Sequence, residues 1–177
     1  MTVVDSVVAR WFLIISVTAF IQIAFASDFQ PFGTHPDLLL LIGVAAGLAG
    51  GEARGATVGF ICGLLIDLLS VGTLGVTALA FAVTGYIVGR VSQMLLDASW
   101  LTHLGIIALG SLGGVIMQLG ITTLLGGDAF EHNSVWSSVM VITILNSMLA
   151  LPALRAAMWA QQPQAHQPRH GIELRRD

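Results

Sequence analysis

The sequence predicts an all-α membrane protein, a polytopic bundle of six transmembrane helices with both termini in the cytoplasm. Hydrophobic residues make up 55% of the 177 and charged residues 10%, whereas soluble domains carry about 25% charge. The mean hydropathy is +0.86, and apolar runs recur along the chain with short polar connections between them. A chain this apolar cannot cover its surface with polar groups in water, so a lipid bilayer is the solvent that suits it.

Six apolar segments follow one another along the chain. They are residues 7–27, 37–51, 53–70, 76–96, 103–125 and 135–157. The first and the last three reach about 20 residues, which is long enough to cross the hydrocarbon core. The first segment has a rival interpretation, because Ala24-Phe25-Ala26 resembles a signal-peptide cleavage site. We expect an uncleaved helix, since the single charge, Arg10, lies ten residues into the chain and apolar residues precede it.

The second and third segments are shorter and rich in glycine, and the turn between them is Glu52-Ala53-Arg54. Both segments can span the membrane, or they can form a re-entrant hairpin that dips in and returns. The hairpin would place Glu52 and Arg54 near the bilayer centre, at a cost of about 2.5–3.5 kcal/mol for each charge. We therefore expect two spanning helices joined by a tight turn in water.

The arginines indicate how the helices are oriented. Arg10 lies at the start of the first segment, and Arg54 lies between the second and third. Arg90 is near the end of the fourth segment, and Arg155 is near the end of the sixth. The other basic residues, all in the tail, are Arg169, Arg175 and Arg176. Six crossings place all of them on one side, which the positive-inside rule identifies as the cytoplasm.

Residues 161–177 differ from the rest of the chain, because they are polar and contain prolines. This composition predicts a disordered cytoplasmic tail that follows a helical bundle at 1–160. His166 and His170 have the spacing of metal ligands on a helix, but Pro168 disfavours that helix. The sequence shows no other metal-ligand cluster, no P-loop, no serine–histidine pair and no basic groove. We therefore expect no enzymatic activity, metal, cofactor or nucleic-acid partner.

Glycines recur every four residues across the second and third segments. They are Gly43, Gly47, Gly51, Gly55, Gly59 and Gly63, and Gly85 and Gly89 repeat the spacing in the fourth segment. On helices this spacing gathers small residues on one face, where two backbones can approach closely in lipid. The face can pack these segments on each other as antiparallel helices, or it can dock a partner membrane protein.

Asp67 is an acid inside an apolar run, where an ionisable residue is costly and tends to face a bundle interior or a cavity. Arg90 should not pair with it, because the two lie near opposite ends of their segments, about 20 Å apart in depth. Three roles remain open for Asp67. It can fix the turn at 72–75, take part in a partner or ligand site, or couple to protons.

The middle of the chain resembles the MreD family of rod-shape-determining membrane proteins. The resemblance begins with Pro-Asp-Leu-Leu-Leu-Leu at 36–41 and continues with Gly-x-x-x-Gly-Phe-x-x-Gly-Leu-x-x-Asp at 55–67. It ends with Leu-Gly-Val-Thr-Ala-Leu at 74–79 and Gly-Tyr-Ile-Val-Gly-Arg at 85–90. It therefore covers residues 36–90, and the other segments match in hydropathy alone.

The resemblance implies a non-enzymatic, multi-pass scaffold in the bacterial inner membrane that belongs to the cell-elongation machinery. Its implied partners are an MreC-like membrane protein, the actin-like MreB, peptidoglycan synthases and membrane lipid. MreD proteins are also similar in architecture to the substrate-binding subunits of energy-coupling-factor transporters. The alternative function is therefore a substrate-binding membrane subunit of a small-molecule transporter, in which Asp67 would line a cavity open to the outer side.

Overall fold

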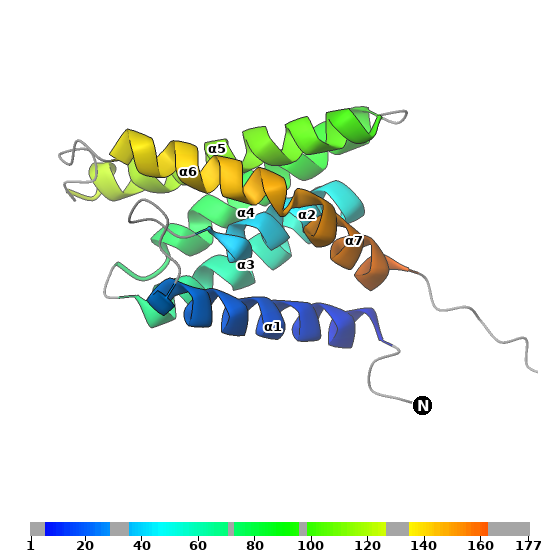
Figure 1. The fold of residues 1–177 in the computed structure, drawn as a ribbon, viewed down its shortest axis with the longest axis horizontal. Coiled ribbons are helices and arrows are strands. Elements are labelled where there is room, and N and C mark those ends of the chain that lie inside the picture. The colour runs from blue at the N-terminus through cyan, green and yellow to red at the C-terminus, as the bar shows by residue number, and fades with distance from the viewer. Residues whose placement is uncertain (1–5, 29–35, 71–72, 96–98, 127–134, 163–177) are drawn as a thin grey trace, which may run out of the picture.

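A computed structural model describes residues 6–28, 36–70, 73–95, 99–126 and 135–162. Within these ranges the chain forms seven helices and no strand, which confirms the all-α class. They are α1 (Val7–Asp28), α2 (Leu38–Gly50), α3 (Glu52–Leu69), α4 (Val76–Met94), α5 (Trp100–Leu124), α6 (Val135–Met148) and α7 (Ala150–Gln161). Figure 1 shows α1 along one side of the molecule and α5 with α6 along the other, with α2, α3 and α4 between them.

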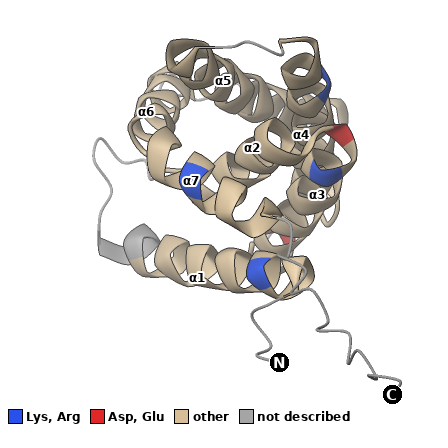
Figure 2. Ribbon diagram, turned by 90° about the vertical axis from the view of Figure 1, so that its right-hand side faces the viewer, with Lys and Arg blue, Asp and Glu red and all other residues tan. Residues whose placement is uncertain are grey.

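Helix α2 forms the centre of the bundle. Every residue from 39 to 47 is buried, and Leu40, Val44, Ala45 and Ala46 are fully enclosed. Helices α1, α3, α4, α5 and α7 all contact it, and Figure 2 shows it surrounded in the view along the bundle. A helix that is apolar on every face is covered all round by protein or by lipid, and here protein covers it, so α2 organises the fold.

The predicted sixth helix, residues 135–157, is two helices rather than one. Helices α6 and α7 meet at Leu149 with a bend of 56°. Pro152 lies in the first turn of α7 and has no N–H to donate to the carbonyl of Met148, four residues earlier. The six predicted segments therefore become seven helices.

By length and apolar composition, α1 and α5 can each cross a membrane, and the bent pair α6–α7 passes the same test jointly. Composition thus accounts for two to three crossings in the described part of the chain. Helix α2 is apolar but has 13 residues, a length of about 20 Å against a hydrocarbon core of about 30 Å. Helix α3 has the length of a span, but Glu52, Arg54 and Asp67 lower its hydropathy.

Candidate functional site

The glycines of α2 and α3 bring these two helices into backbone contact. A Cβ atom added to Gly43 would lie 3.0 Å from the Cα of Gly59, and one added to Gly55 would lie 2.6 Å from the Cα of Gly47. The residue numbers rise along one helix as they fall along the other, so the pair is antiparallel. At these positions even an alanine methyl group would meet the backbone of the neighbouring helix.

The same face of α3 lies against α4 in one continuous register. A Cβ on Gly55 would collide with the carbonyl oxygen of Gly85, and a Cβ on Gly59 would collide with that of Phe81. Gly63 lies in the same way against Thr77. Each step of four residues up α3 matches a step of four residues down α4. The α3–α4 hairpin is therefore held by close backbone contact along its length, which is how small residues stabilise helix pairs in lipid.

Three helices meet at one point of this face. Gly47 of α2, Gly55 of α3 and Gly85 of α4 each lie against the backbone of another member of the trio. Gly89, one turn further along α4, lies against the backbone of Glu52. Gly51, between α2 and α3, has a φ of +79°, a left-handed conformation that a residue with a side chain rarely adopts.

Asp67 extends the glycine face by one more step, because it follows Gly63 by four residues. Its side chain is buried, and Oδ2 accepts hydrogen bonds from the backbone N–H of Gly75 at 2.8 Å and of Ala78 at 3.1 Å. Oδ1 accepts a third from the N–H of Thr77 at 3.2 Å. These donors belong to the first turn of α4, which has no helical carbonyls to bond to. The carboxylate thus caps α4 from the end of α3, where it also complements the helix dipole.

Helix α5 joins this capped turn through a further polar contact. Nε2 of Gln118 donates a hydrogen bond of 3.1 Å to Oγ1 of Thr77. Thr77 is thus hydrogen-bonded to Asp67 through its backbone N–H and to Gln118 through its side-chain hydroxyl. The contact connects α3, α4 and α5 at one end of the bundle.

The opposite end of the α3–α4 hairpin carries an ion pair. Nη1 of Arg90 lies 3.2 Å from Oε2 of Glu52, and both side chains are partly exposed. The stem of Arg54 lies beside Gly50. Because Asp67 and the Arg90–Glu52 pair lie at opposite ends of one hairpin, Asp67 and Arg90 make no pair with each other.

Arg10 connects α1 to α7 at the end that carries the Arg90–Glu52 pair. Its Nη1 donates to the carbonyls of Trp159 at 3.2 Å and Gln162 at 3.3 Å, and its guanidinium lies 5.2 Å from the centre of the Trp159 ring. Figure 2 looks onto this end and shows the arginine positions of α1, α3 and α7 towards the viewer. Arg10, Arg54 and Arg90 therefore share one end of the bundle, and Arg155 lies on α7, whose last turn reaches that end.

A second polar cluster, which the sequence does not predict as a site, holds the start of α2. Oδ1 of Asp37 accepts from the N–H of Leu40 at 3.0 Å and caps α2. Nδ2 of Asn146, on α6, donates to the carbonyl oxygen of Asp37 at 3.1 Å, and Oε1 of Gln22, on α1, accepts from the N–H of Leu39 at 2.9 Å. An acid directly before an apolar run is a usual signal of a helix start, but the sequence does not reveal which distant amides reach it.

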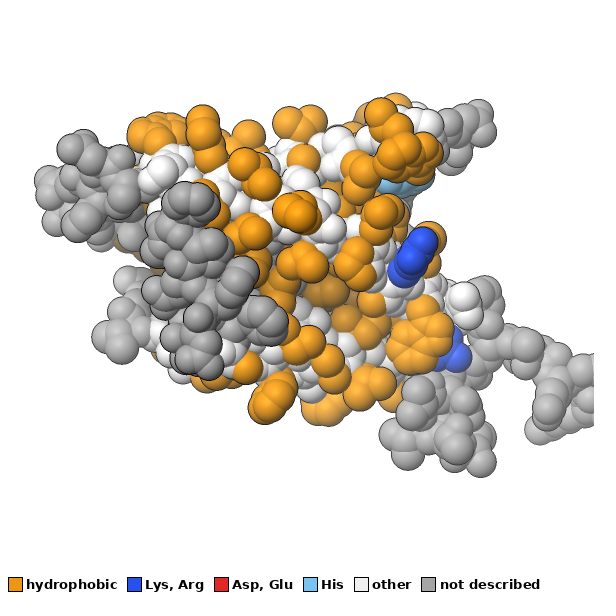
Figure 3. Space-filling view, in the orientation of Figure 1, with side chains coloured by type: hydrophobic (Ala, Val, Ile, Leu, Met, Phe, Trp, Pro, Cys, Tyr) orange, Lys and Arg blue, Asp and Glu red, His pale blue; other side chains and the backbone are white. Residues whose placement is uncertain are grey.

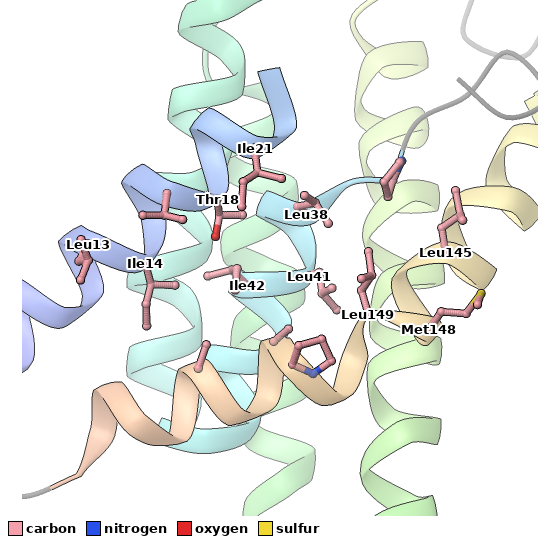
Figure 4. A pocket seen from close by; sticks show the side chains of 15 residues that line it. Leu13, Ile14, Thr18, Ile21, Leu38, Leu41, Ile42, Leu145, Met148 and Leu149 are labelled. Atoms are coloured by element: carbon pink, nitrogen blue, oxygen red, sulfur yellow. The ribbon is translucent and has the colours of Figure 1, made fainter. Parts of the chain in front are cut away.

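A groove of about 640 Å³ separates α1 from α6 and α7. Figure 4 shows the labelled side chains of α1 on one side and Leu145, Met148 and Leu149 on the other, with those of α2 between them. Thr18 is the one polar residue among its described lining residues. A smaller cavity of about 240 Å³ lies between α4 and α5. Asp67 lines neither of these spaces.

No group of three or more His, Cys, Asp or Glu residues is arranged to hold a metal ion in the described part of the chain. The site is instead a set of backbone contacts between helices, capped at one end by a carboxylate. Such an arrangement holds helices at fixed positions.

These features define the class of protein, a helical membrane protein whose core is built on small residues. Residues 5–158 match the family model of the rod shape-determining protein MreD, so the chain belongs to the MreD family. The match confirms the resemblance found between residues 36 and 90 and extends it over the first, fifth and sixth segments. No curated protein and no solved structure matches the chain, so the architectural similarity to energy-coupling-factor subunits stays a prediction.

Proposed function

We propose that the protein is a non-enzymatic inner-membrane scaffold of the cell-elongation machinery. In this role it holds an MreC-like membrane protein, and it links that protein and the actin-like MreB to the peptidoglycan synthases that build the lateral wall. Membership of the MreD family implies a role in rod shape determination. The observation that supports a scaffold is the backbone contact of α2, α3 and α4, because closely packed helices present a surface of constant shape to a partner.

The proposed topology has six crossings with both termini in the cytoplasm. Helices α1 to α5 each cross once, and α6 with α7 forms one bent crossing. The shared end of Arg10, Arg54 and Arg90 supports this arrangement, since basic residues gather on the cytoplasmic side. Helix α2 need not match the bilayer thickness, because protein rather than lipid surrounds it. The bundle then comprises residues 1–160, with a polar cytoplasmic tail at 161–177, most of which lies outside the described residues.

The glycines can affect the partner through the shape of the core. Gly47 and Gly59 lie against α4 of the same chain, so a large side chain at either position would displace a helix and alter the outer surface. We expect Gly59→Leu to enter the membrane but to lose the MreC-like partner. Gly105→Leu is the matched control, because nothing lies within 4 Å of a Cβ at Gly105.

The test is replacement of the gene in a rod-shaped bacterium, with cell shape and co-purification of the MreC-like protein as readouts. The native chain and Gly105→Leu should keep rods and retain the partner, and Gly59→Leu should give rounded cells without it. Deletion without a change of shape would contradict the proposal, as would retention of the partner by Gly59→Leu.

The alternative, a substrate-binding subunit of a small-molecule transporter, has less support. In this alternative Asp67 would line the cavity, but its carboxylate already accepts hydrogen bonds from three backbone N–H groups. The larger groove offers Thr18 as its one polar group among the described lining residues, whereas sites for polar molecules carry several placed polar groups.

A further inference from the structure

The groove between α1 and α7 lies between two polar contacts that connect α1 to the rest of the bundle. Arg10 bonds to the carbonyls of Trp159 and Gln162, and Gln22 bonds to the N–H of Leu39. Between these contacts, Leu13, Val17 and Ile21 lie over the groove and remain 37–49% exposed. On the other side the bend at Leu149 turns α7 away from the line of α6.

The groove of about 640 Å³ is partly open to the surface of the bundle, and its walls are almost entirely apolar. The walls of an empty space lose their dispersion contacts on one side. Water is a poor occupant here, since a buried water needs two to four polar partners. The described lining offers the hydroxyl of Thr18 alone, so the occupant should be aliphatic.

The size of the groove distinguishes between two aliphatic occupants. A transmembrane helix is about 10 Å wide and 30 Å long, a volume on the order of 2,400 Å³. That volume is several times the 640 Å³ available, so the groove cannot enclose a helix between α1 and α7. An acyl chain is narrow and flexible, and lipid surrounds a membrane bundle on every side. Figure 3 shows hydrophobic side chains on this face of the molecule, with the visible arginines towards one end.

We propose that this groove binds one acyl chain of a membrane phospholipid. The α2 residues that line it, Leu38, Leu41 and Ile42, lie at the end of that helix nearest Asp37. The α1 and α7 walls extend from there towards the arginine end, as far as Leu13 and Ala156. Binding of the chain does not depend on the proposed function or topology. The bound chain completes the packing of α1 between its two polar ties.

The test uses the full-length protein in bilayer nanodiscs that contain phosphatidylethanolamine with a photoreactive diazirine on one acyl chain. Native mass spectrometry after release into detergent should detect one retained phospholipid. Illumination should attach the probe to peptides that contain Leu13–Ile21 and to peptides of α7. Labelling spread evenly over the outer faces of α3, α4 and α5 would overturn the proposal, as would a second copy of the chain crosslinked at the groove.

Three variants and a control make the result specific. Ala153→Phe and Ala156→Phe fill the groove and should lose the retained lipid and the label on α1. Leu151→Phe adds the same ring to the same helix outside the lining and should keep both. Thr18→Val should also keep both, and loss of the adduct in this variant would indicate a polar ligand and overturn the proposal. Ala153 is buried, so the half-buried Ala156 provides the test if Ala153→Phe does not fold.

Retention of the lipid by a folded Ala156→Phe protein would also overturn the proposal. This outcome is separate from failure of the proposed function, because lipid retention is measured on the purified chain without a partner. A protein that keeps its lipid but does not support rod shape would contradict the scaffold proposal alone.

Discussion

The carboxylate of Asp67 accepts a 2.8 Å hydrogen bond from the N–H of Gly75, which ties the end of α3 to the start of α4. Two further amides of the same turn, those of Thr77 and Ala78, donate to the same side chain. This one residue therefore satisfies three backbone donors that have no partner within α4. The three hydrogen bonds offset the free-energy cost of burying a carboxylate in an apolar helix.

Asp67→Leu should destabilise the protein more than Asp67→Asn. Leucine leaves the buried amides of Thr77 and Ala78 and the half-buried amide of Gly75 without an acceptor, at a cost of at least about 2 kcal/mol. Asparagine keeps one acceptor oxygen and should lose about half as much. Unfolding of the purified protein by increasing sodium dodecyl sulfate, followed by circular dichroism, measures the difference. Equal stability of Asp67→Leu and the native chain would show that α4 does not depend on this cap.

The ion pair at the other end of the hairpin should matter much less. Arg90 and Glu52 are 3.2 Å apart, but their side chains are 56% and 31% exposed. Exposed pairs contribute about 1 kcal/mol or less, so Glu52→Gln should shift the same unfolding midpoint only slightly, and 1 M salt should remove the difference. A loss as large as that of Asp67→Leu would contradict this ranking of the two carboxylates.

A single methyl group should distinguish closed glycines from open ones. At Gly55 an added Cβ would meet backbone atoms of both Gly47 and Gly85, whereas at Gly105 it would meet nothing within 4 Å. Overpacking of this kind costs about 1–3 kcal/mol, so Gly55→Ala should unfold earlier. Gly105→Ala should be as stable as the native chain or more so, because alanine favours a helix. The comparison fails if both variants unfold at the same denaturant concentration.

The shared end of the arginines gives a direct test of topology. In a Cys62→Ala background, which removes the free buried thiol, cysteines at positions 54 and 155 should react from the cytoplasm. A cysteine at the exposed Leu74 should react with an impermeant reagent added outside intact cells. Labelling of positions 54 and 155 from opposite compartments would eliminate the six-crossing arrangement.

Local patterns in the sequence predict the helices and the glycine spacing, because both depend on periodicity. Asp67 follows Gly63 by the same four residues, so the sequence also predicts that it lies on the glycine face. The sequence does not predict which distant segments pack against each other. The sequence suggested that the glycines face each other across α2 and α3, and the structure adds α4, whose carbonyl oxygens lie against Gly55, Gly59 and Gly63. The groove depends on the tertiary position of α1 and leaves no local pattern.

The sequence does not predict the break between α6 and α7, because a proline in an apolar run is tolerated in membrane helices and does not by itself end one. Pro152→Ala restores an N–H that can bond to the carbonyl of Met148, so the two helices should approach a single straight helix. Spin labels at the exposed Met140 and Met158 should then move apart in electron paramagnetic resonance measurements. Straightening a 56° bend increases the straight-line distance between two positions on opposite sides of it. Leu151→Ala serves as the control and should leave the distance unchanged. An unchanged distance in Pro152→Ala would mean that packing against α2, rather than the missing donor, bends the chain at Leu149.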